Sequence, residues 1–489
     1  MIVRLNSSFQ PKTIYDVCVV GSGAAGITIA AQSRRLGLSV FLAEGGDSDF
    51  SDESQMLYRG TVQGDEYYDL DIARLRYFGG TTNHWGGMCR PLDAYDFEPK
   101  SASADSGWPI GIDEVRPYLA DAAKILEVDL PVQDRIINKE RTIKRVHYVY
   151  SPPVRFGEKY RKTFAEDSDM TLCLNCNLVG VNFDGNVVRK AKFQNFEGLQ
   201  LEVSARIFVL ACGGIENSRI LLFENSKYVN MLGNQAGSVG KYWMEHPTYT
   251  VGNLHSCGSL TLPDDDIDID PQNLFYLVPT PKFAEEKRIM NCRLRIERDD
   301  FSFFEQSLAK TACFANDIFG ESVSGLIAGK AGRIRASWEQ EPDRANAVFL
   351  GGQKDSLGIP RAILHWKKSP LVKKTLKTFC IEAGKYFALN SDARMRLHEW
   401  VLSDGTMFEC VGEGQCPGAF HHMGGTRMAE SPKTGVVDKN CRVFGTGNLF
   451  VAGSSVYPSS GYANPTMGIV QLSLRLADHL HTVIGAGRQ

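Results

Sequence analysis

The sequence has no run of about 18 apolar residues, the length that a helix needs to cross a membrane. It also has no basic excess: 54 Lys and Arg stand against 57 Asp and Glu, so the formal charge is −3. Proteins that bind nucleic acid through its phosphates carry a clear basic excess. We therefore expect no membrane span and no nucleic-acid partner. Residues 1–7 contain no apolar segment of the signal-peptide type, which predicts a cytoplasmic location.

Several patterns of metal and covalent chemistry are also absent. The only Cys-x-x-Cys is Cys173 to Cys176, and without a second pair it does not predict zinc. No His-x-x-x-His pair and no G-x-S-x-G turn occurs, so we expect no metal and no serine hydrolase. The twelve cysteines are scattered, which in a cytoplasmic protein predicts reduced thiols. We interpret the acidic run at residues 264–270 as a solvated loop; the alternative is a site for a cationic ligand.

Glycine, in contrast, is abundant, with 47 of 489 residues against a usual share of ~7%. The first cluster is Gly21, Gly23 and Gly26, which lies between a strand-like apolar run at residues 15–20 and a helical pattern at residues 27–36. In such a loop the first glycine permits a tight turn, the second admits a pyrophosphate, and the third lets helix and strand pack closely. This spacing therefore predicts a phosphate-binding turn.

A second apolar run at residues 39–43 ends in Glu44 and completes a β-α-β unit. An acidic residue at that point accepts hydrogen bonds from ribose hydroxyls. The unit therefore predicts a dinucleotide site, and by itself it does not separate NAD from FAD.

Two further apolar runs, residues 206–211 and 448–453, are typical of parallel strands that are buried on both faces. We therefore predict an α/β fold with a Rossmann-like domain formed by residues 1–244 and 406–489. Residues 245–405 are predicted to form an inserted α+β domain for the substrate. Its alternating runs, such as residues 347–350 and 362–366, favour an antiparallel sheet.

The other glycine-rich segments are residues 78–87, 421–428 and 453–455. A helix is predicted to begin at Asn464-Pro465-Thr466, with Asn464 as N-cap and Pro465 as the first helical residue.

Together with residues 213–218 and 240–247, these segments resemble the glucose–methanol–choline (GMC) flavoprotein oxidoreductase family over nearly the whole chain. The Gly-Gly-Thr-Arg-Met segment at 424–428 and Asn464-Pro465-Thr466 are most similar to the branch of pyranose oxidases and sugar dehydrogenases. The resemblance implies FAD as the cofactor and oxidation of an alcohol.

The resemblance further implies that His422, four residues before Thr426, accepts the hydroxyl proton while hydride passes to the flavin. It assigns Asn464 as the partner of His422. A neutral imidazole suits proton acceptance near pH 7, and an amide can donate to the substrate oxygen. We interpret His421 as a packing residue.

The glycine pattern and the resemblance together imply a set of residues that contact FAD: Gly21, Gly23, Ala24, Ala25, Gly26, Glu44, Gly45, Gly80, Thr81, Asn83, His84, Trp85, Gly86, Gly87, Val179, Ala211, Gly213, Gly453, Ser454, Asn464, Pro465 and Thr466. His84 matches the histidine to which pyranose oxidases attach FAD covalently. Asn83 replaces the Thr of that pattern, so we expect FAD without a covalent bond and keep the bond as the alternative.

The expected reaction is oxidation of a sugar, glycoside or polyol at a secondary hydroxyl, as in glycoside 3-oxidases, and the near balance of charge agrees with a neutral substrate. The alternatives are an aminoglycoside, a cyclitol or another alcohol as substrate, a non-redox lyase-type homologue, or an NAD-dependent dehydrogenase. We expect oxygen or a quinone-type redox carrier as electron acceptor and leave the oligomeric state open.

Overall fold

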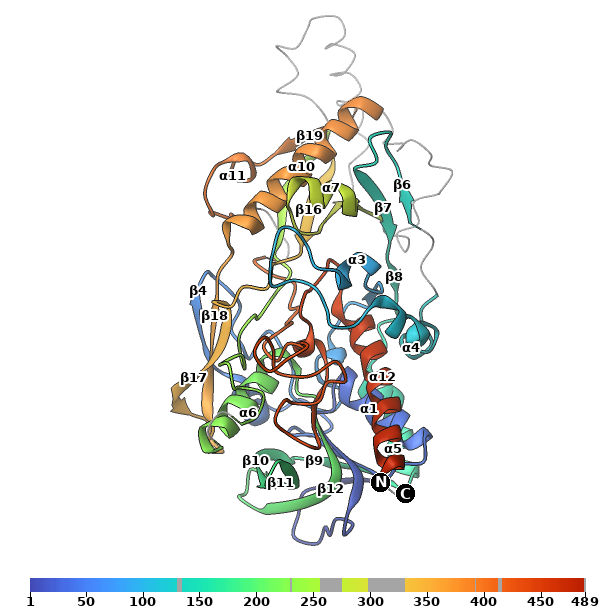
Figure 1. Cartoon of the computed structure of the whole chain (residues 1–489), viewed down its shortest axis with the longest axis vertical. Coiled ribbons are helices and arrows are strands. Elements are labelled where there is room, and N and C mark those ends of the chain that lie inside the picture. Colours follow the sequence, from blue (N-terminus) through green and yellow to red (C-terminus); the bar gives the residue numbers. More distant parts are fainter. Residues whose placement is uncertain are drawn as a thin grey trace, which may run out of the picture.

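The computed structural model describes residues 1–129, 134–228, 231–255, 275–297, 330–391, 393–411 and 416–487. The acidic run at residues 264–270 lies outside these ranges. Figure 1 shows two layers of structure along the long axis, with a parallel sheet towards one end and a second sheet with α10 towards the other. No helix in the described ranges is both long and apolar enough to cross a membrane.

Six strands form the parallel sheet. Their spatial order is β1 (Ile2–Arg4), β9 (Met170–Leu174), β3 (Val40–Ala43), β2 (Tyr15–Val20), β12 (Gln200–Leu210) and β20 (Leu449–Val451). All six residues of β2 are buried, as expected for a strand that is covered on both faces. The first half of β12 also pairs antiparallel with β11 (Val187–Gln194), which pairs with β10 (Asn177–Asp184). The predicted α/β fold is therefore confirmed, with one sheet that joins both ends of the chain.

Helices pack on this sheet and enclose its apolar core. α1 (Ala24–Arg35) lies against α12 (Pro465–Ala486), and Figure 1 shows this pair beside the sheet. The remaining helices of this part are α2 (Asp52–Gln55), α3 (Ala94–Phe97), α4 (Leu119–Leu126), α5 (Phe156–Glu166) and α6 (Gly213–Lys227), and the single 3₁₀ turns are η1 (Met56–Tyr58), η2 (Gly80–Asn83), η3 (Ile112–Glu114), η4 (Arg116–Tyr118) and η6 (Ser454–Val456).

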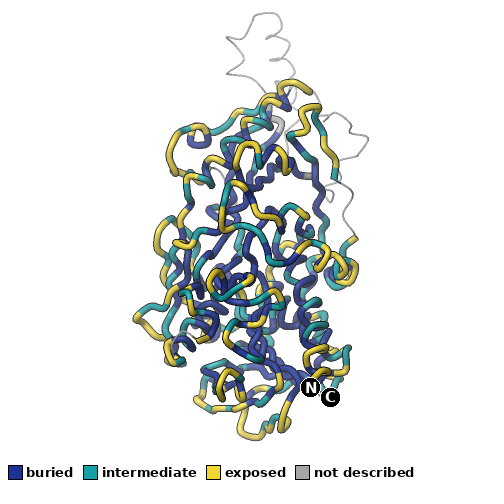
Figure 2. Tube along the Cα trace, in the orientation of Figure 1, coloured by how far each residue is buried: buried dark blue, intermediate teal, exposed yellow. Residues whose placement is uncertain are grey.

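The second large sheet has seven strands. Their order is β19 (Arg394–Leu397), β13 (Thr248–His255), β16 (Lys330–Trp338), β15 (Cys292–Glu297), β14 (Phe275–Pro279), β7 (Ile143–His147) and β6 (Arg135–Ile136), and its pairs are antiparallel. One face packs on α10 (Pro370–Asn390) in a separate apolar core. Two short helices, α7 (Pro281–Lys287) and α11 (Glu399–Leu402), complete this layer. Figure 2 shows buried backbone in the interior of both layers.

This sheet differs from the predicted inserted domain in two ways. β6 and β7 come from residues 135–147, before the predicted boundary at residue 245. β17 (Ala347–Lys354) and β18 (Pro360–Trp366) lie outside it and form a three-stranded sheet with β4 (Thr61–Gly64). The physical reason is their apolar partners: Leu364 and Trp366 pack against Trp243 and Ile215 rather than on α10. β5 (Met88–Cys89) and β8 (Val149–Tyr150) pair as a separate two-stranded ribbon.

One pair of cysteines departs from the prediction that the thiols are reduced. Cys410 and Cys416 form a disulfide, with Cα atoms 6.0 Å apart, a usual separation for such a bond. The prediction of reduced thiols was therefore wrong for these two. The two cysteines are six positions apart, a spacing that differs from Cys-x-x-Cys. Eight other described cysteines are free, and Cys173 and Cys176 are both buried.

Candidate active site

A cavity of about 750 Å³ lies between the parallel sheet and the seven-stranded sheet. Its walls include the glycine turn after β2, the end of β3 and the residues that follow β12. In open α/β sheets ligands bind at the carboxyl ends of the strands, and pockets for small molecules span roughly 300–1,000 Å³. The cavity is therefore the candidate active site.

The glycine turn has little room for side chains. Gly21 has φ +98°, and a Cβ atom there would lie 2.7 Å from the carbonyl oxygen of Ala211. A Cβ atom at Gly26 would lie 1.8 Å from the carbonyl oxygen of Gly21. At Gly23, by contrast, a Cβ atom would meet no protein atom within 4 Å. Two of the three glycines are thus required by packing, whereas Gly23 borders open space in the cavity wall.

Glu44 is held rigidly at the end of β3. Its Oε2 accepts hydrogen bonds from the amide of Ser22 at 3.1 Å and from the hydroxyl of Ser22 at 2.5 Å. Its Oε1 accepts from the amide of Gly46 at 2.8 Å. A carboxylate has about four lone-pair sites, so the fixed Glu44 retains capacity to accept further hydrogen bonds in the cavity, whose wall it forms.

Most of the predicted site residues line this cavity: Gly21, Gly23, Ala24, Ala25, Glu44, Gly45, Gly80, Thr81, His84, Trp85, Gly86, Gly87, Ala211, Gly213, His422, Gly453, Ser454, Asn464, Pro465 and Thr466. Three do not. Gly26 packs beneath the turn, and Asn83 donates to the carbonyl oxygen of Phe78 at 2.9 Å and so braces its own loop. Val179 lies at a register shift in β10, where the neighbouring Leu178 lines the cavity instead.

His422 is buried and contacts a polar chain. Its Nε2 lies 3.0 Å from the hydroxyl oxygen of Tyr67, and that hydroxyl donates to Oε2 of Glu245. The oxygen of Tyr67 is therefore the acceptor for His422, and a neutral His422 donates from Nε2 and keeps Nδ1 unprotonated. Burial, with a smaller contribution from Arg74, lowers the pKa of His422 to about 3, which keeps the ring neutral at pH 7.

His421 also lines the cavity, and a second histidine fixes its tautomer. Nε2 of His246 lies 2.9 Å from the carbonyl oxygen of Gly461, so this nitrogen carries the proton. Burial first, and Arg293 second, lower the pKa of His246 to about 3. Its Nδ1 therefore accepts from Nδ1 of His421, 2.9 Å away. Nε2 of His421 is left as the unprotonated nitrogen, so His421 is more than the packing residue that its sequence position suggested.

Asn464 stands at the N-cap position of α12, as predicted, but its side chain makes no cap hydrogen bond. Its Nδ2 donates to the carbonyl oxygen of Met88 at 3.2 Å. Its Oδ1 is buried and has no hydrogen-bond partner among the described residues. A buried polar atom without a partner is rare in folded proteins, which indicates that a ligand group completes this position.

Sequence reasoning missed Tyr67, Glu245 and His246. Glu245 and His246 lie next to each other within residues 240–247, and this adjacent acid and histidine were the available signal. Tyr67 lies in a loop after β4 with no local pattern, so its contact with His422 depends on the tertiary fold.

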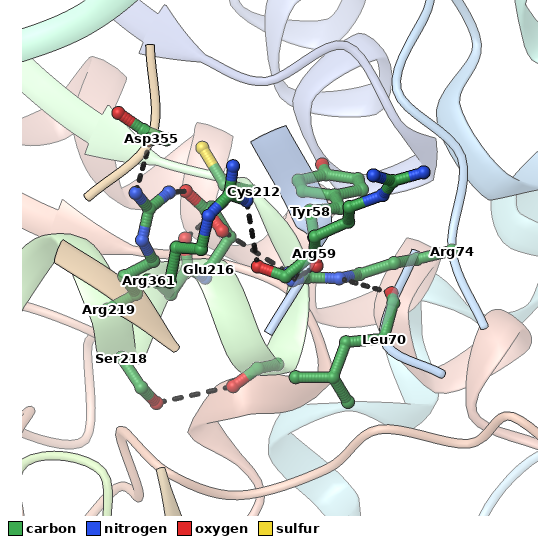
Figure 3. Close-up of polar contacts among 12 residues, drawn as sticks. Tyr58, Arg59, Leu70, Arg74, Cys212, Glu216, Ser218, Arg219, Asp355 and Arg361 are labelled. Carbon is green, nitrogen blue, oxygen red and sulfur yellow. Dashed lines mark hydrogen bonds and ion pairs between the residues drawn. The ribbon is translucent and has the colours of Figure 1, made fainter. Parts of the chain in front are cut away.

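An ionic network on α6 reaches the cavity wall, which Arg74 and Glu216 line. Figure 3 shows its contacts. Glu216 accepts from Arg74 at 3.3 Å and from Arg219 at 2.7 Å, and Arg219 also pairs with Asp355. Arg74 lies over the ring of Tyr58, 3.9 Å from its centroid. All these charged side chains are buried, so each depends on its partners to offset lost hydration.

Replacing Glu216 by Ala is expected to lower the free energy of unfolding by about 3–5 kcal/mol, because two buried guanidinium groups lose their shared carboxylate. The measurement is unfolding in urea and by heat. Glu202→Ala is the matched control, because Glu202 pairs with Lys190 on the surface and such pairs contribute about 0–1 kcal/mol. Equal small effects in both variants would contradict a structural role for the network.

The parallel sheet with its glycine turn faces the antiparallel sheet across one cavity. This arrangement defines an α/β enzyme of the dinucleotide-binding class. A family model described as GMC oxidoreductase matches residues 342–473. The chain is 22% identical to paromamine 6'-oxidase of Streptomyces fradiae, over 95% of this chain and 91% of that protein. It is 26% identical to the fructose dehydrogenase large subunit of Gluconobacter japonicus, over 56% of this chain and 47% of that one.

A solved structure of an FAD-dependent oxidoreductase from Chaetomium thermophilum has the same fold, with a TM-score of 0.59 and 14% identity over 96% of this chain and 100% of that one. Residues 342–473 thus form a GMC oxidoreductase C-terminal domain, and the chain is an alcohol oxidoreductase.

Proposed function

We propose that the chain is an FAD-dependent enzyme that oxidises a hydroxyl group of a sugar, glycoside or polyol to a carbonyl group. The observation that carries this proposal is one cavity that contains the glycine turn with Glu44 and, in the same walls, His422 with Asn464. The names of two relatives, paromamine 6'-oxidase and fructose dehydrogenase, support a sugar-like substrate.

The described residues fit FAD. The open side of Gly23 leaves space for a pyrophosphate against the backbone, and the fixed Glu44 carboxylate suits ribose hydroxyls. The first turn of α12 provides N–H groups and a positive dipole end at Asn464. When bound, FAD supplies the acceptor for the hydride from the substrate carbon.

We propose that His422 takes the proton of the substrate hydroxyl at Nδ1. The positive charge that forms on the ring is then stabilised through Nε2 by Tyr67 and the carboxylate of Glu245, in the way that a buried acid stabilises an imidazolium. The second N–H of the Asn464 amide, which is not used by Met88, donates to the substrate oxygen. Burial of this end of the cavity excludes water and strengthens both interactions.

Three finer points belong to the same proposal. The division into a flavin domain (residues 1–244 and 406–489) and a substrate domain (residues 245–405) is retained with two changes: β6 and β7 join the substrate domain, and β17 and β18 join the flavin domain with β4. FAD is held without a covalent bond to His84, whose exposed side chain borders the cavity. The electron acceptor is oxygen or a quinone-type carrier.

The test is anaerobic bleaching of the flavin. The purified protein is expected to carry bound FAD, and a panel of sugars, glycosides and polyols is mixed with it without oxygen. Loss of the absorbance of oxidised flavin with at least one alcohol supports the proposal, and reoxidation with oxygen or a quinone identifies the acceptor. Acid precipitation separates free from covalently bound FAD.

Two results would contradict the proposal. A protein that binds NAD and no flavin would be a dehydrogenase of another class. A bound flavin that no alcohol reduces would favour a non-redox lyase-type enzyme.

A further inference from the structure

The second histidine of the cavity wall, His421, is fixed against His246 by the backbone as well as by its ring. An antiparallel bridge joins Met244 to Met423, and the two histidines lie opposite each other, two residues from this bridge. The carboxylate of Glu245 accepts a hydrogen bond from each of their backbone amides, both at 2.8 Å. The rings meet edge to face, with centroids 5.1 Å apart. The orientation of the His421 ring is therefore well determined.

The hydrogen bonds within this pair leave one ring nitrogen over. His246 donates from Nε2 to the carbonyl oxygen of Gly461 and accepts at Nδ1, so the proton of His421 is on its own Nδ1. Nε2 of His421 has no hydrogen-bond partner among the described residues, and it is not one of their buried polar atoms that lack a partner. This nitrogen is therefore accessible, and since His421 lines the cavity, it is reached from there.

Nε2 of His421 remains an acceptor at pH 7. Burial, followed by the charges of His246, Arg293 and His422, lowers the pKa of this ring well below 6.5. A deprotonated imidazole nitrogen accepts hydrogen bonds and cannot donate them. An acceptor shielded from bulk water costs free energy unless a donor replaces the lost water. A ligand group that donates a hydrogen bond is therefore expected at this nitrogen.

The hydroxyl group that is oxidised cannot be this donor. It carries a single hydrogen, which under the proposed function it gives to Nδ1 of His422. The two histidines are consecutive in sequence, and His422 contributes to the lowered pKa of His421, so the two rings lie near each other. A second donor on the same substrate molecule, close to the reacting carbon, would satisfy both acceptors at once.

We propose that Nε2 of His421 binds a second hydroxyl group of the substrate, near the one that is oxidised, and so selects diols over simple alcohols. This inference rests on the proposed function and adds a specificity-determining residue to it. A hydroxyl suits the position better than an ammonium group, because a neutral nitrogen does not offset the lost hydration of a charge. His246 is a positioning residue, which acts by keeping the proton of His421 on Nδ1.

The first experiment measures binding without turnover. Pinacol and 2,4-dimethyl-2,4-pentanediol are a 1,2-diol and a 1,3-diol whose carbinol carbons carry no hydrogen, so neither transfers hydride. Their references are the mono-alcohols 2,3-dimethyl-2-butanol and 2,4-dimethyl-2-pentanol, and perturbation of the flavin spectrum gives each Kd. We expect the better diol to bind at least about tenfold more tightly than its mono-alcohol, which leaves the acceptor unpaired. The better diol also identifies the spacing of the two hydroxyls.

The second experiment changes the acceptor. His421→Phe keeps an aromatic ring and removes both nitrogens, so diol and mono-alcohol are expected to bind within about twofold of each other. His421→Gln, whose amide oxygen can replace Nε2 as acceptor, is expected to retain the preference for the diol. His481→Phe is the matched control, because His481 is exposed on α12. Thermal unfolding and FAD content verify the fold of each variant.

His246→Gln tests the positioning role. Gln can still donate to Gly461, but Nδ1–H of His421 loses its acceptor, so the proton is free to move to Nε2. Nitrogen-15 NMR of the histidine rings, with the His421 signals assigned by their loss in His421→Phe, is expected to show Nε2 unprotonated in the wild type. In His246→Gln it is expected to become partly protonated, with a matching loss of the diol preference. An unchanged tautomer would overturn the role of His246.

Two results would overturn the inference: diols that bind no more tightly than mono-alcohols in the wild type, or a diol preference that survives in His421→Phe. Flavin reduction by sugars and polyols tests the proposed function separately. If diols bind through His421 while no alcohol reduces the flavin, the proposed oxidation fails and the diol site stands. If alcohols reduce the flavin and mono-alcohols bind as tightly as diols, the oxidation stands and the role of His421 fails.

Discussion

Replacing His422 by Ala is expected to slow flavin reduction by about 10²–10⁴-fold, the usual contribution of a positioned general base. The ring is neutral, buried and linked to Glu245 through Tyr67, so its loss removes both the proton acceptor and its stabilising partners. The measurement is stopped-flow reduction without oxygen, with the FAD absorbance of the variant as the control for an intact site.

His421→Ala is the informative comparison, because His421 also lines the cavity and also has an unprotonated ring nitrogen. It is expected to slow reduction far less than His422→Ala. A His422→Ala enzyme that reduces flavin at the normal rate, or a larger loss in His421→Ala, would transfer the role of base to His421.

The pH profile of flavin reduction gives an independent readout of His422. Its pKa is lowered from 6.5 to about 3, chiefly by burial, so the ring stays able to accept a proton as the pH falls through 6.5. Burial raises the pKa of Glu245 to about 7, and Glu245→Gln removes that titration. In this variant the rate is expected to be flat between about pH 5 and pH 8. An acid limb near pH 6.5 would show that His422 titrates in the ordinary histidine range.

Gly26→Ala is expected to abolish FAD binding and to destabilise the fold by about 3 kcal/mol or more. The added Cβ atom would lie 1.8 Å from the carbonyl oxygen of Gly21. The oxygen belongs to the backbone of the turn and the Cβ atom is bonded directly to the backbone of α1, so the clash is relieved only if α1 moves away from the turn. The measurements are thermal unfolding and the flavin content of the purified variant.

Gly23→Ala is the matched control, because it adds the same atom at a position where no protein atom lies within 4 Å of the Cβ atom. This variant is expected to unfold at the wild-type temperature and to bind FAD at least about tenfold more weakly, since the methyl group occupies the pyrophosphate approach. Unchanged FAD affinity in Gly23→Ala would contradict the placement of the phosphates at this turn.

The parallel sheet was predictable because its strands are continuous apolar runs next to glycine, as at residues 15–20 and 206–211. Such runs indicate burial on both faces wherever they lie in the chain. The seven-stranded sheet was less predictable at its edge, because β7 has the sequence Ile-Lys-Arg-Val-His. Its polar residues, of which Arg145 and His147 are buried, interrupt the apolar pattern, and only pairing with β14 identifies it as part of the sheet.

Within the cavity, the glycine turn, His422 and Asn464 could be predicted from local sequence motifs. The contact of Tyr67 with His422 could not, since 355 residues separate them along the chain.

The sheet order has a consequence for synthesis. β2 and the glycine turn leave the ribosome first, whereas β20, His422 and the start of α12 follow residue 420, yet β20 pairs with β12 and α12 packs on α1. Contacts between such distant segments form late and slowly. The early turn is therefore expected to stay exposed until the last strand and helix have docked, and we expect the cofactor to bind only after that step.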